Sequence, residues 1–296
     1  MKNIYNEKWL NKNTSSLSGK TVAITGSTGG LGKALCRYLA YLGASLILID
    51  RNAARSDEVK NSLICDFPEI SVKCINADLE DISSVRSACE LLAEEPIDIF
   101  IHNAGAYSIP RKTCSTGYDN VFQINFVSPY YIIKKLLPVL SQRHGRVVVV
   151  GSIAHNYSKT DVTSIDFANR TKASKVYGNA KRYLMYSLYG IKDQAENTSV
   201  SVTHPGISFT GITAHYPKLI FALIKHPMKI IFMKPKKAVL SILKGVFEPC
   251  ENYEWIGPRL FDVWGLPKKK KLNTASKKEI EFIQSTAERI YTELDK

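Results

Sequence analysis

Short apolar runs alternate with longer stretches of helical periodicity through most of this chain. The run 44–50, ASLILID, is apolar almost throughout, which is typical of a strand that is covered on both faces. Strands are predicted at 22–24, 44–50, 70–75, 97–101, 145–150, 199–203 and within 253–266. Helices are predicted at 33–41, 58–67, 83–95, 117–140, 176–189, 238–247 and 276–293. This alternation predicts one α/β domain, with a doubly wound, mostly parallel sheet and helices on both faces.

The longest predicted helix, 117–140, contains three residues that interrupt its pattern. Asn125 lies on the apolar face. A buried amide must find hydrogen-bond partners, so Asn125 is either a structural bridge or a site residue. Pro129 predicts a local kink, and Pro138 predicts the end of the helix.

The first strand leads into a glycine-rich turn, TGSTGGLG, which opens the first helix. Gly26, Gly30 and Gly32 lie in this turn. Glycines let a backbone approach a pyrophosphate, and a helix N-terminus offers free N–H groups and the positive end of its dipole. The turn therefore predicts a dinucleotide site, with an ordinary strand–helix turn as the alternative. Its spacing, T-G-x-x-x-G-x-G, differs from the fingerprint G-x-G-x-x-G.

Two acidic residues at the ends of later strands are candidate cofactor contacts. Asp50 lies 20 residues after Gly30, where a carboxylate can accept hydrogen bonds from the adenosine ribose hydroxyls. Its charge favours NAD over NADP, whereas a guanidinium at Arg51 would pair with a 2′-phosphate. Asp78 either bonds the adenine amino group or caps the following helix.

Polar side chains gather where two further strands end. The small segment Asn103–Gly105 follows strand 97–101 and leaves room for a ligand. Ser152 follows strand 145–150, and its hydroxyl is well placed to face that ligand. Tyr177 and Lys181 are four residues apart in a predicted helix, so they share one helical face. His155 is interpreted as a polar loop residue.

Composition narrows the classes of function. The chain has 296 residues, 45% of them hydrophobic and 23% charged, which allows a large core and argues against disorder. The net charge of +13 favours solubility and attraction to anions, lipid headgroups included, while no recognised nucleic-acid motif is present. The six cysteines lack metal-site spacing and are typical of buried residues in a reducing compartment. Without a signal peptide or a membrane-spanning apolar run, a cytoplasmic location is expected, with peripheral membrane association left open.

In combination these motifs resemble the short-chain dehydrogenase/reductase family, in its compact single-domain branch. The resemblance implies a Rossmann-type fold and an oxidoreductase that uses NAD or NADP to transfer a hydride to or from an alcohol or carbonyl substrate. The matching pieces are Thr25-Gly26-x-x-x-Gly30-x-Gly32, Asp78-Leu79, Asn103-Ala104-Gly105, Asn125, Ser152, Tyr177-x-x-x-Lys181 and Pro205-Gly206 with Thr210.

The resemblance also assigns roles to individual residues. Tyr177 would be the general acid/base. Lys181, helped by the positive nicotinamide ring, would lower the pKa of its phenol from about 10 and would bond the nicotinamide ribose. Ser152 would hold the substrate oxygen, and Asn125 would anchor a water that links Lys181 to solvent. The implied cofactor contacts are Gly26, Ser27, Thr28, Gly30, Leu31, Gly32, Asp50, Arg51, Asp78, Leu79, Asn103, Ala104, Gly105, Tyr177, Lys181, Pro205, Gly206 and Thr210.

Three positions refine this resemblance. His102 stands where family members often have a first asparagine, and it leaves Asn103 intact. The interval of 25 residues between Ser152 and Tyr177 resembles the retinol-dehydrogenase-like side of the family, which implies a bulky or apolar substrate. Gly29 stands where NADP-preferring members often place a basic residue, which agrees with a preference for NAD.

The segment 218–237 interleaves apolar residues with lysines, where the family has its substrate lid. A pocket-lining lid with outward lysines is the favoured interpretation, and contact with anionic lipid or with another subunit are the alternatives. We expect an N-terminal extension at 1–18, a Rossmann-fold domain at 19–266 with its lid segment at 207–237, and a basic tail and helix at 267–296. The expected partners are a small-molecule substrate and a second copy of the chain, and no nucleic acid.

Two other functions stay open. A sugar-nucleotide epimerase or dehydratase of the extended branch shares the Tyr-x-x-x-Lys pair, but the glycine spacing argues against it. The other is a non-catalytic, membrane-associated dinucleotide-binding protein. The joint presence of Asn125, Ser152, Tyr177 and Lys181 argues against that function.

Overall fold

The computed structural model describes residues 6–192, 194, 197–206 and 233–296. These residues contain one eight-stranded sheet in the order β3-β2-β1-β4-β5-β6-β7-β8. The first seven strands are parallel, and β8 is antiparallel to β7, so the expected doubly wound, mostly parallel sheet is confirmed. The strands are β1 Thr21–Thr25, β2 Ser45–Asp50, β3 Val72–Asn76, β4 Ile99–His102, β5 Arg146–Val150, β6 Ser199–Thr203, β7 Glu254–Leu260 and β8 Trp264–Lys271.

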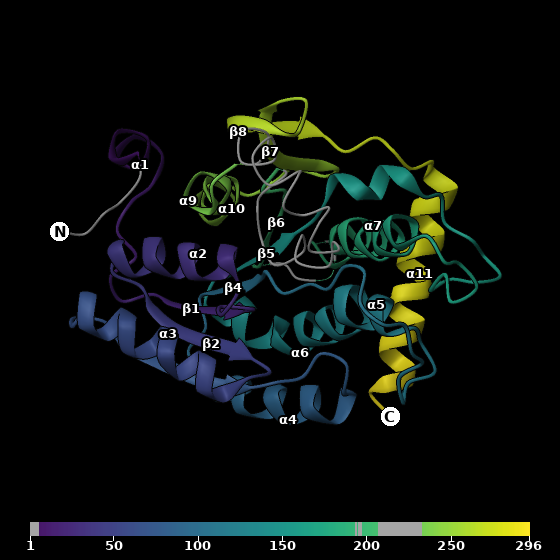
Figure 1. Ribbon diagram of the computed structural model, residues 1–296, viewed down its shortest axis with the longest axis horizontal. Helices are drawn as coiled ribbons and strands as arrows, with labels where there is room; N and C mark the ends of the chain where they lie inside the picture. Colours follow the sequence, from purple (N-terminus) through teal and green to yellow (C-terminus); the bar gives the residue numbers. More distant parts are fainter. Residues whose placement is uncertain (1–5, 193, 195–196, 207–232) are drawn as a thin grey trace, which may run out of the picture.

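Helices cover both faces of this sheet (Figure 1). One core lies between the sheet and α4, α6 and α7, with α11 packed outside α7, and the other lies between the sheet and α2, α3 and α10. The α-helices are α1 Glu7–Asn13, α2 Gly30–Tyr41, α3 Ala53–Asp66, α4 Ile82–Ala93, α5 Asn120–Phe122, α6 Ser128–Gln142, α7 Ala173–Lys192, α9 Pro235–Ala238, α10 Leu240–Phe247 and α11 Lys277–Leu294. A π-helical turn, η1 Gln123–Val127, joins α5 to α6, and a 3₁₀ turn, η2 Ile153–Tyr157, follows β5.

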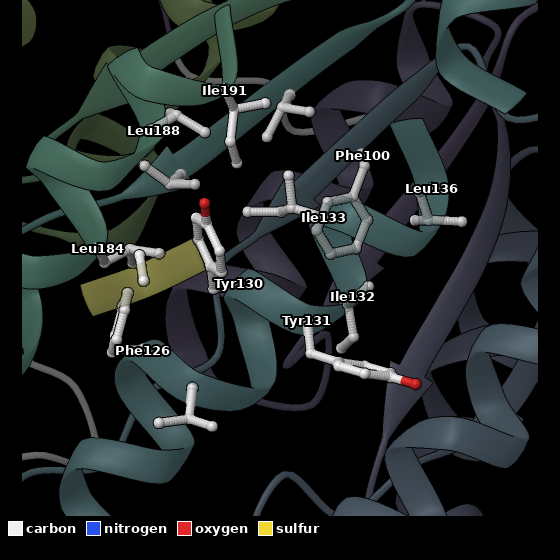
Figure 2. Close-up of a cluster of buried hydrophobic side chains, with 14 of the residues drawn as sticks. Phe100, Phe126, Tyr130, Tyr131, Ile132, Ile133, Leu136, Leu184, Leu188 and Ile191 are labelled. Carbon is white, nitrogen blue, oxygen red and sulfur yellow. The ribbon is translucent and has the colours of Figure 1, made fainter. Parts of the chain in front are cut away.

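The apolar strands are explained by burial on both faces. Ile47 and Ile49 of β2 belong to one core, and Leu46 and Leu48 of the same strand belong to the other. Successive side chains of a strand point to opposite faces, so a strand covered on both sides is apolar throughout. Figure 2 shows the first core, where aromatic and aliphatic side chains of α6 lie between β4 and α7.

Local signals fix where several helices begin. The side chain of Asn52 accepts a hydrogen bond from a backbone N–H in the first turn of α3, and Asp81 does the same for α4. Ser276 caps α11 by accepting a hydrogen bond from the N–H of Glu279. Such caps satisfy N–H groups that have no partner inside the helix. Asp78 is therefore not the cap of the helix that follows it, because Asp81 fills that position.

Two other expectations are corrected, and a third gains detail. Pro138 lies inside α6, which continues to Gln142, because the proline is exposed and water can bond the carbonyl that loses its helical partner. Residues 268–271 belong to β8 and not to a tail. The extension at the N-terminus forms α1, whose Trp9 and Leu10 are buried in the second core.

The order of the strands determines where a ligand can bind. The chain builds the sheet outwards from β1 to β3 and then returns to add β4 on the other side of β1. The loops that follow β1 and β4 therefore leave the sheet on opposite faces, which opens a crevice at the carboxyl ends of these strands.

Candidate active site

A cavity of about 620 Å³ lies at the carboxyl ends of β1, β2 and β4. The glycine turn forms one wall, and the residues that follow β3 and β4 form others. Most of the sequence-predicted cofactor residues thus come together here. Those that line the cavity are Gly26, Thr28, Gly30, Leu31, Gly32, Asp50, Arg51, Asp78, Leu79, Asn103, Ala104 and Gly105.

Two glycines of the turn leave no room for a side chain. A Cβ atom on Gly32 would lie 2.0 Å from the carbonyl oxygen of Gly26. A Cβ atom on Gly26 would lie 2.8 Å from the Cα of Ala104, and Gly26 has a φ of +73°, in the left-handed region. At Gly29, by contrast, the nearest atom would be 3.6 Å away. The turn is therefore tightly packed, and its backbone atoms line the cavity.

Asp50 holds this turn in place. Its carboxylate accepts hydrogen bonds from the Ser27 hydroxyl at 2.5 Å and from the Ser56 hydroxyl at 3.2 Å. It also accepts bonds from the N–H and the hydroxyl of Thr28, at 3.2 Å and 3.1 Å. Asp50 is buried, whereas the neighbouring Arg51 is exposed and lines the same cavity. The Asp50 carboxylate thus stabilises the glycine turn, a role that the sequence pattern does not reveal.

Asn103 and Thr25 join the ends of β4 and β1. The side-chain N–H₂ of Asn103 donates to the carbonyl oxygens of Thr25 and Gly26, at 3.1 Å and 3.0 Å. The Thr25 hydroxyl oxygen accepts from the backbone N–H groups of Asn103 and Ala104, so its own proton is left to donate to Nδ1 of His102, 3.0 Å away. His102 is then neutral with its proton on Nε2. Burial, followed by the charge of Lys181, lowers the pKa of His102 well below its usual value.

Asn125 lies in the π-helical turn and connects it to the loop after β4. Its amide group donates to the carbonyl oxygens of Ala106 and Val121, both at 2.8 Å, and its oxygen accepts from the N–H of Ala106 at 3.3 Å. A π-helical turn shifts the hydrogen-bond pattern by one residue, and such turns are frequent at functional sites. The Asn125 side chain therefore forms a structural bridge, and its expected role as a site residue stays a prediction.

Ser152, Tyr177 and Lys181 gather beside this loop. The ammonium nitrogen of Lys181 lies 5.7 Å from the centre of the Tyr177 ring and donates to the carbonyl oxygen of Val150 at 2.9 Å. Ser152 caps the 3₁₀ turn η2, where its oxygen accepts from the N–H of Ala154 at 3.2 Å, and its hydroxyl lowers the pKa of the Tyr177 phenol. The ring of Tyr107 meets the Tyr177 ring edge-on, with centroids 5.3 Å apart.

The cavity and this cluster share one wall. A Cβ atom on Gly105 would lie 2.8 Å from Oδ1 of Asn125 and 3.5 Å from Nζ of Lys181. Gly105 also lines the cavity. Only the backbone of Gly105 would therefore lie between a ligand in the cavity and Lys181.

Burial controls the protonation of the tyrosine and the lysine. It raises the pKa of Tyr177, against a lowering hydrogen bond from Ser152, to about 12. Burial lowers the pKa of Lys181 to about 7. The expectation that Lys181, together with a positively charged nicotinamide ring, depresses the pKa of the phenol stays a prediction, because without the cofactor burial has the largest effect on Tyr177.

A buried ion pair behind the cluster escaped the sequence analysis. The guanidinium of Arg182, 2% exposed, donates to both carboxylate oxygens of Glu279 on α11, at 2.7 Å and 2.8 Å. It also donates to the carbonyl oxygen of His155, three residues after Ser152, at 3.1 Å. His155 is buried and faces the Trp255 ring, so its interpretation as a polar loop residue is wrong. In the sequence, the only indication of this ion pair was the presence of Arg182 directly after Lys181.

The remaining predicted residues lie apart from the cavity or outside the described chain. Ser27 is buried beneath the turn, and Pro205 and Gly206 follow β6 beside the β7–β8 connection. Thr210 and the segment 218–232 lie outside the described residues. Among the residues with described positions, no group of His, Cys, Asp and Glu could hold a metal ion, and no helix is long and apolar enough to cross a membrane. The cysteines described are all free, and three of the six are buried.

Comparisons with known proteins identify the family of this chain and several of its relatives. The model of the short chain dehydrogenase family matches residues 20–215. A chloroplastic short-chain dehydrogenase of Brassica napus is 29% identical over 269 residues, covering 85% of this chain and 81% of the relative. Retinol dehydrogenase 14 of Homo sapiens is 31% identical over 278 residues, covering 83% and 82%.

Solved structures share the fold. An uncharacterized protein from Mycobacterium paratuberculosis superposes with a TM-score of 0.73 at 20% identity, covering 95% of this chain and 94% of that one. A short-chain dehydrogenase from Sphingobium yanoikuyae, in complex with NADPH, superposes with a TM-score of 0.60 at 21% identity, covering 76% and 84%.

Proposed function

The chain belongs to the short-chain dehydrogenase family, and we propose that it transfers a hydride between NAD or NADP and an alcohol or carbonyl substrate. The observation that carries this proposal is the shared wall at Gly105, which lines the cavity and lies against Asn125 and Lys181. It supports the proposal because the cavity proposed for the dinucleotide then adjoins the side chains proposed for proton transfer.

The cavity residues fit a nicotinamide dinucleotide. The crowding at Gly26 and Gly32 leaves bare backbone where a pyrophosphate can approach, next to the N-terminus of α2. Asp50 and Arg51 line the part of the cavity expected to receive the adenosine ribose. When bound, the dinucleotide supplies the hydride donor or acceptor. The preference for NAD stays a prediction, since Asp50 already accepts hydrogen bonds from the turn and the exposed Arg51, which lines the cavity, forms no ion pair with any residue of described position.

Tyr177 is the proposed acid/base. A phenol with a pKa near 12 is protonated at neutral pH, the form that donates a proton to a carbonyl oxygen as the carbonyl is reduced. When Lys181 is protonated, its ammonium, 5.7 Å from the ring centre, stabilises the phenolate left behind. Ser152, whose hydroxyl lowers the pKa of the phenol, is the residue proposed to orient the substrate oxygen.

A bulky or apolar substrate is the second part of the proposal. It is supported by the 25 residues between Ser152 and Tyr177 and by relatives that include retinol dehydrogenase 14. A panel of alcohols and carbonyls, from small polar compounds to long apolar ones, assayed with NAD and NADP separately, tests both the substrate class and the cofactor preference.

Tyr177→Phe tests the mechanism. We expect it to lower kcat about 100-fold or more while cofactor affinity stays within a few-fold, because the hydroxyl transfers the proton and the ring packing is kept. Tyr157→Phe is the matched control, since Tyr157 is 53% exposed and lies in η2. Full activity of Tyr177→Phe on the best substrate would show that the proposed acid/base is wrong.

A further inference from the structure

The β7–β8 hairpin ends in the most exposed aromatic side chain of the described chain. Leu260 pairs with Trp264 across the turn, and Phe261 lies at the tip. Phe261 is 89% exposed, and Leu260, Trp264 and Leu266 are also exposed. The other exposed large hydrophobic residues, Ile64, Leu91, Tyr157 and Val162, lie on other elements. Large apolar side chains gathered on one exposed element mark an interaction site more often than scattered ones do.

The backbone conformation at the tip is unfavourable for a phenylalanine at position 261. The N–H of Val263 donates to the carbonyl oxygen of Leu260, and the two residues between them, Phe261 and Asp262, have φ values of 51° and 57°. Turns of this kind strongly favour Asn, Asp or Gly, and a bulky residue in the left-handed region is strained. Stability alone does not explain a phenylalanine at this position.

Contacts with the body of the protein fix the tip in place. The carboxylate of Asp262 forms an ion pair with Lys270 at 2.6 Å. The carbonyl oxygen of Asp262 lies 3.0 Å from Nε2 of His204, at the end of β6. The tip is therefore a preformed projection that these two contacts of Asp262 hold in place.

The stem of the hairpin is basic. Between Glu254 and Lys271 there are five basic and two acidic residues, in a chain of net charge +13. Lys269, Lys270 and Lys271 each lie within ion-pair distance of a carboxylate. Arg259 and Lys268 are exposed and form no ion pair with any residue whose position is described. These two cations flank the apolar tip and are available to an anionic partner.

This combination fits a lipid surface better than another strand or protein. Phenylalanine and leucine enter the boundary between headgroups and acyl chains, tryptophan is enriched there, and lysine and arginine bind anionic headgroups. β8 is an edge strand, but its lysines and Pro267 oppose pairing with a strand of a second copy. We propose that the β7–β8 tip, Leu260–Leu266, is a docking surface for an anionic lipid bilayer, with Arg259 and Lys268 against the headgroup phosphates.

Docking here would orient the proposed active site. A Cβ atom on Gly206 would lie 2.6 Å from the carbonyl oxygen of Val263 and 2.5 Å from the end of the Met233 side chain. The tip thus packs against the carboxyl end of β6. If the proposed apolar substrate is correct, it would reach the site from the bilayer; the docking itself does not depend on turnover and is tested without it.

Binding to vesicles of phosphatidylcholine, with and without phosphatidylserine, tests the proposal by sedimentation at low and high salt. We expect binding to the anionic vesicles that weakens with salt. Trp264 is the exposed member of the three tryptophans, because Trp9 and Trp255 are buried, so a blue shift of the emission on binding reports on the tip. Trp264→Phe should bind and lose this shift.

Phe261→Asn is the decisive variant, because asparagine accepts the left-handed conformation and preserves the turn. We expect it to lower the partition into anionic vesicles about tenfold and Lys268→Gln about fivefold. Leu91→Ser, on α4 at the opposite end of the molecule (Figure 1), is the matched control and should bind as the wild type does. Absence of binding at low salt, or equal losses in Phe261→Asn and Leu91→Ser, would overturn the proposal. So would self-association that Phe261→Asn abolishes, since this would identify a second copy as the occupant.

Discussion

The buried pair between Arg182 and Glu279 gives the sharpest test of how α11 supports the site. Glu279 is 17% exposed and accepts hydrogen bonds from Arg182 and from the N–H and hydroxyl of Thr160. Arg182 in turn bonds the carbonyl oxygen of His155, close to Ser152. Replacing Glu279 with Gln removes the negative charge and leaves the guanidinium buried without a counter-charge. We therefore expect a large loss of stability.

The magnitude follows from the pKa of Glu279. Burial alone would raise this pKa, but the hydrogen bonds from Arg182 and Thr160 lower it from 4.5 to about 2. At about 1.4 kcal/mol for each tenfold change in the equilibrium, the carboxylate contributes roughly 3 kcal/mol to the free energy of unfolding at pH 7. The loss expected on breaking a buried ion pair is of the same order, about 3–5 kcal/mol.

The pH dependence of the stability difference distinguishes the loss of this ion pair from a nonspecific destabilisation of the fold. The folded-state pKa is depressed, so the contribution is present above pH 4.5 and is lost as the pH falls toward 2. Urea unfolding of Glu279→Gln and of the wild type should differ by about 3 kcal/mol at pH 7 and progressively less below about pH 4.5. Glu281→Gln is the control on the same helix, because Glu281 is 62% exposed and its ion pair with Lys277 is 3.9 Å long. Equal losses in the two variants, or a difference that does not change with pH, would refute the reasoning.

Two further predictions concern the lysine and the glycine turn. Lys181→Met should be more stable than the wild type near pH 7, because burial lowers the pKa of Lys181 to about 7 and the protonated side chain is costly there. The gain should shrink as the pH rises toward about 10, where the lysine is neutral when folded and increasingly neutral when unfolded, and urea unfolding at both pH values checks this. Gly32→Ala should cost about 2 kcal/mol and abolish cofactor binding, because its Cβ would lie 2.0 Å from the carbonyl oxygen of Gly26. Gly29→Ala should change stability by less than about 0.5 kcal/mol, and thermal unfolding with cofactor titration compares the two.

The sequence predicted the parts of the fold that depend on short-range pattern. Strands buried on both faces, such as β2 and β5, stand out as apolar runs, and their alternation with helices leads directly to the parallel sheet. The grouping of Tyr177 with Lys181 needed only the four-residue spacing of a helix. Each of these inferences rests on residues that are close together in the chain.

The features that the sequence analysis missed depend on residues far apart in the chain or on exposure to solvent. The pairing of Arg182 with Glu279 joins residues 97 positions apart. The π-helical turn at Asn125 keeps an apolar pattern that is the same as that of an α-helix. Residues 268–271 form an edge strand, where lysines are favoured and the apolar signal of a strand is lost. The pKa of Tyr177 depends on how deeply the ring is buried, which spacing does not reveal.

The distance along the chain between α7 and α11 has a consequence for synthesis. At about 5–20 residues per second, the ribosome needs roughly 5–20 s to travel the 97 residues from Arg182 to Glu279. During this interval α7 has been made, but its outer face and the guanidinium of Arg182 await their partners. A nascent chain that already carries Ser152, Tyr177 and Lys181 is therefore still exposed to chaperones and proteases at this helix until α11 has been made.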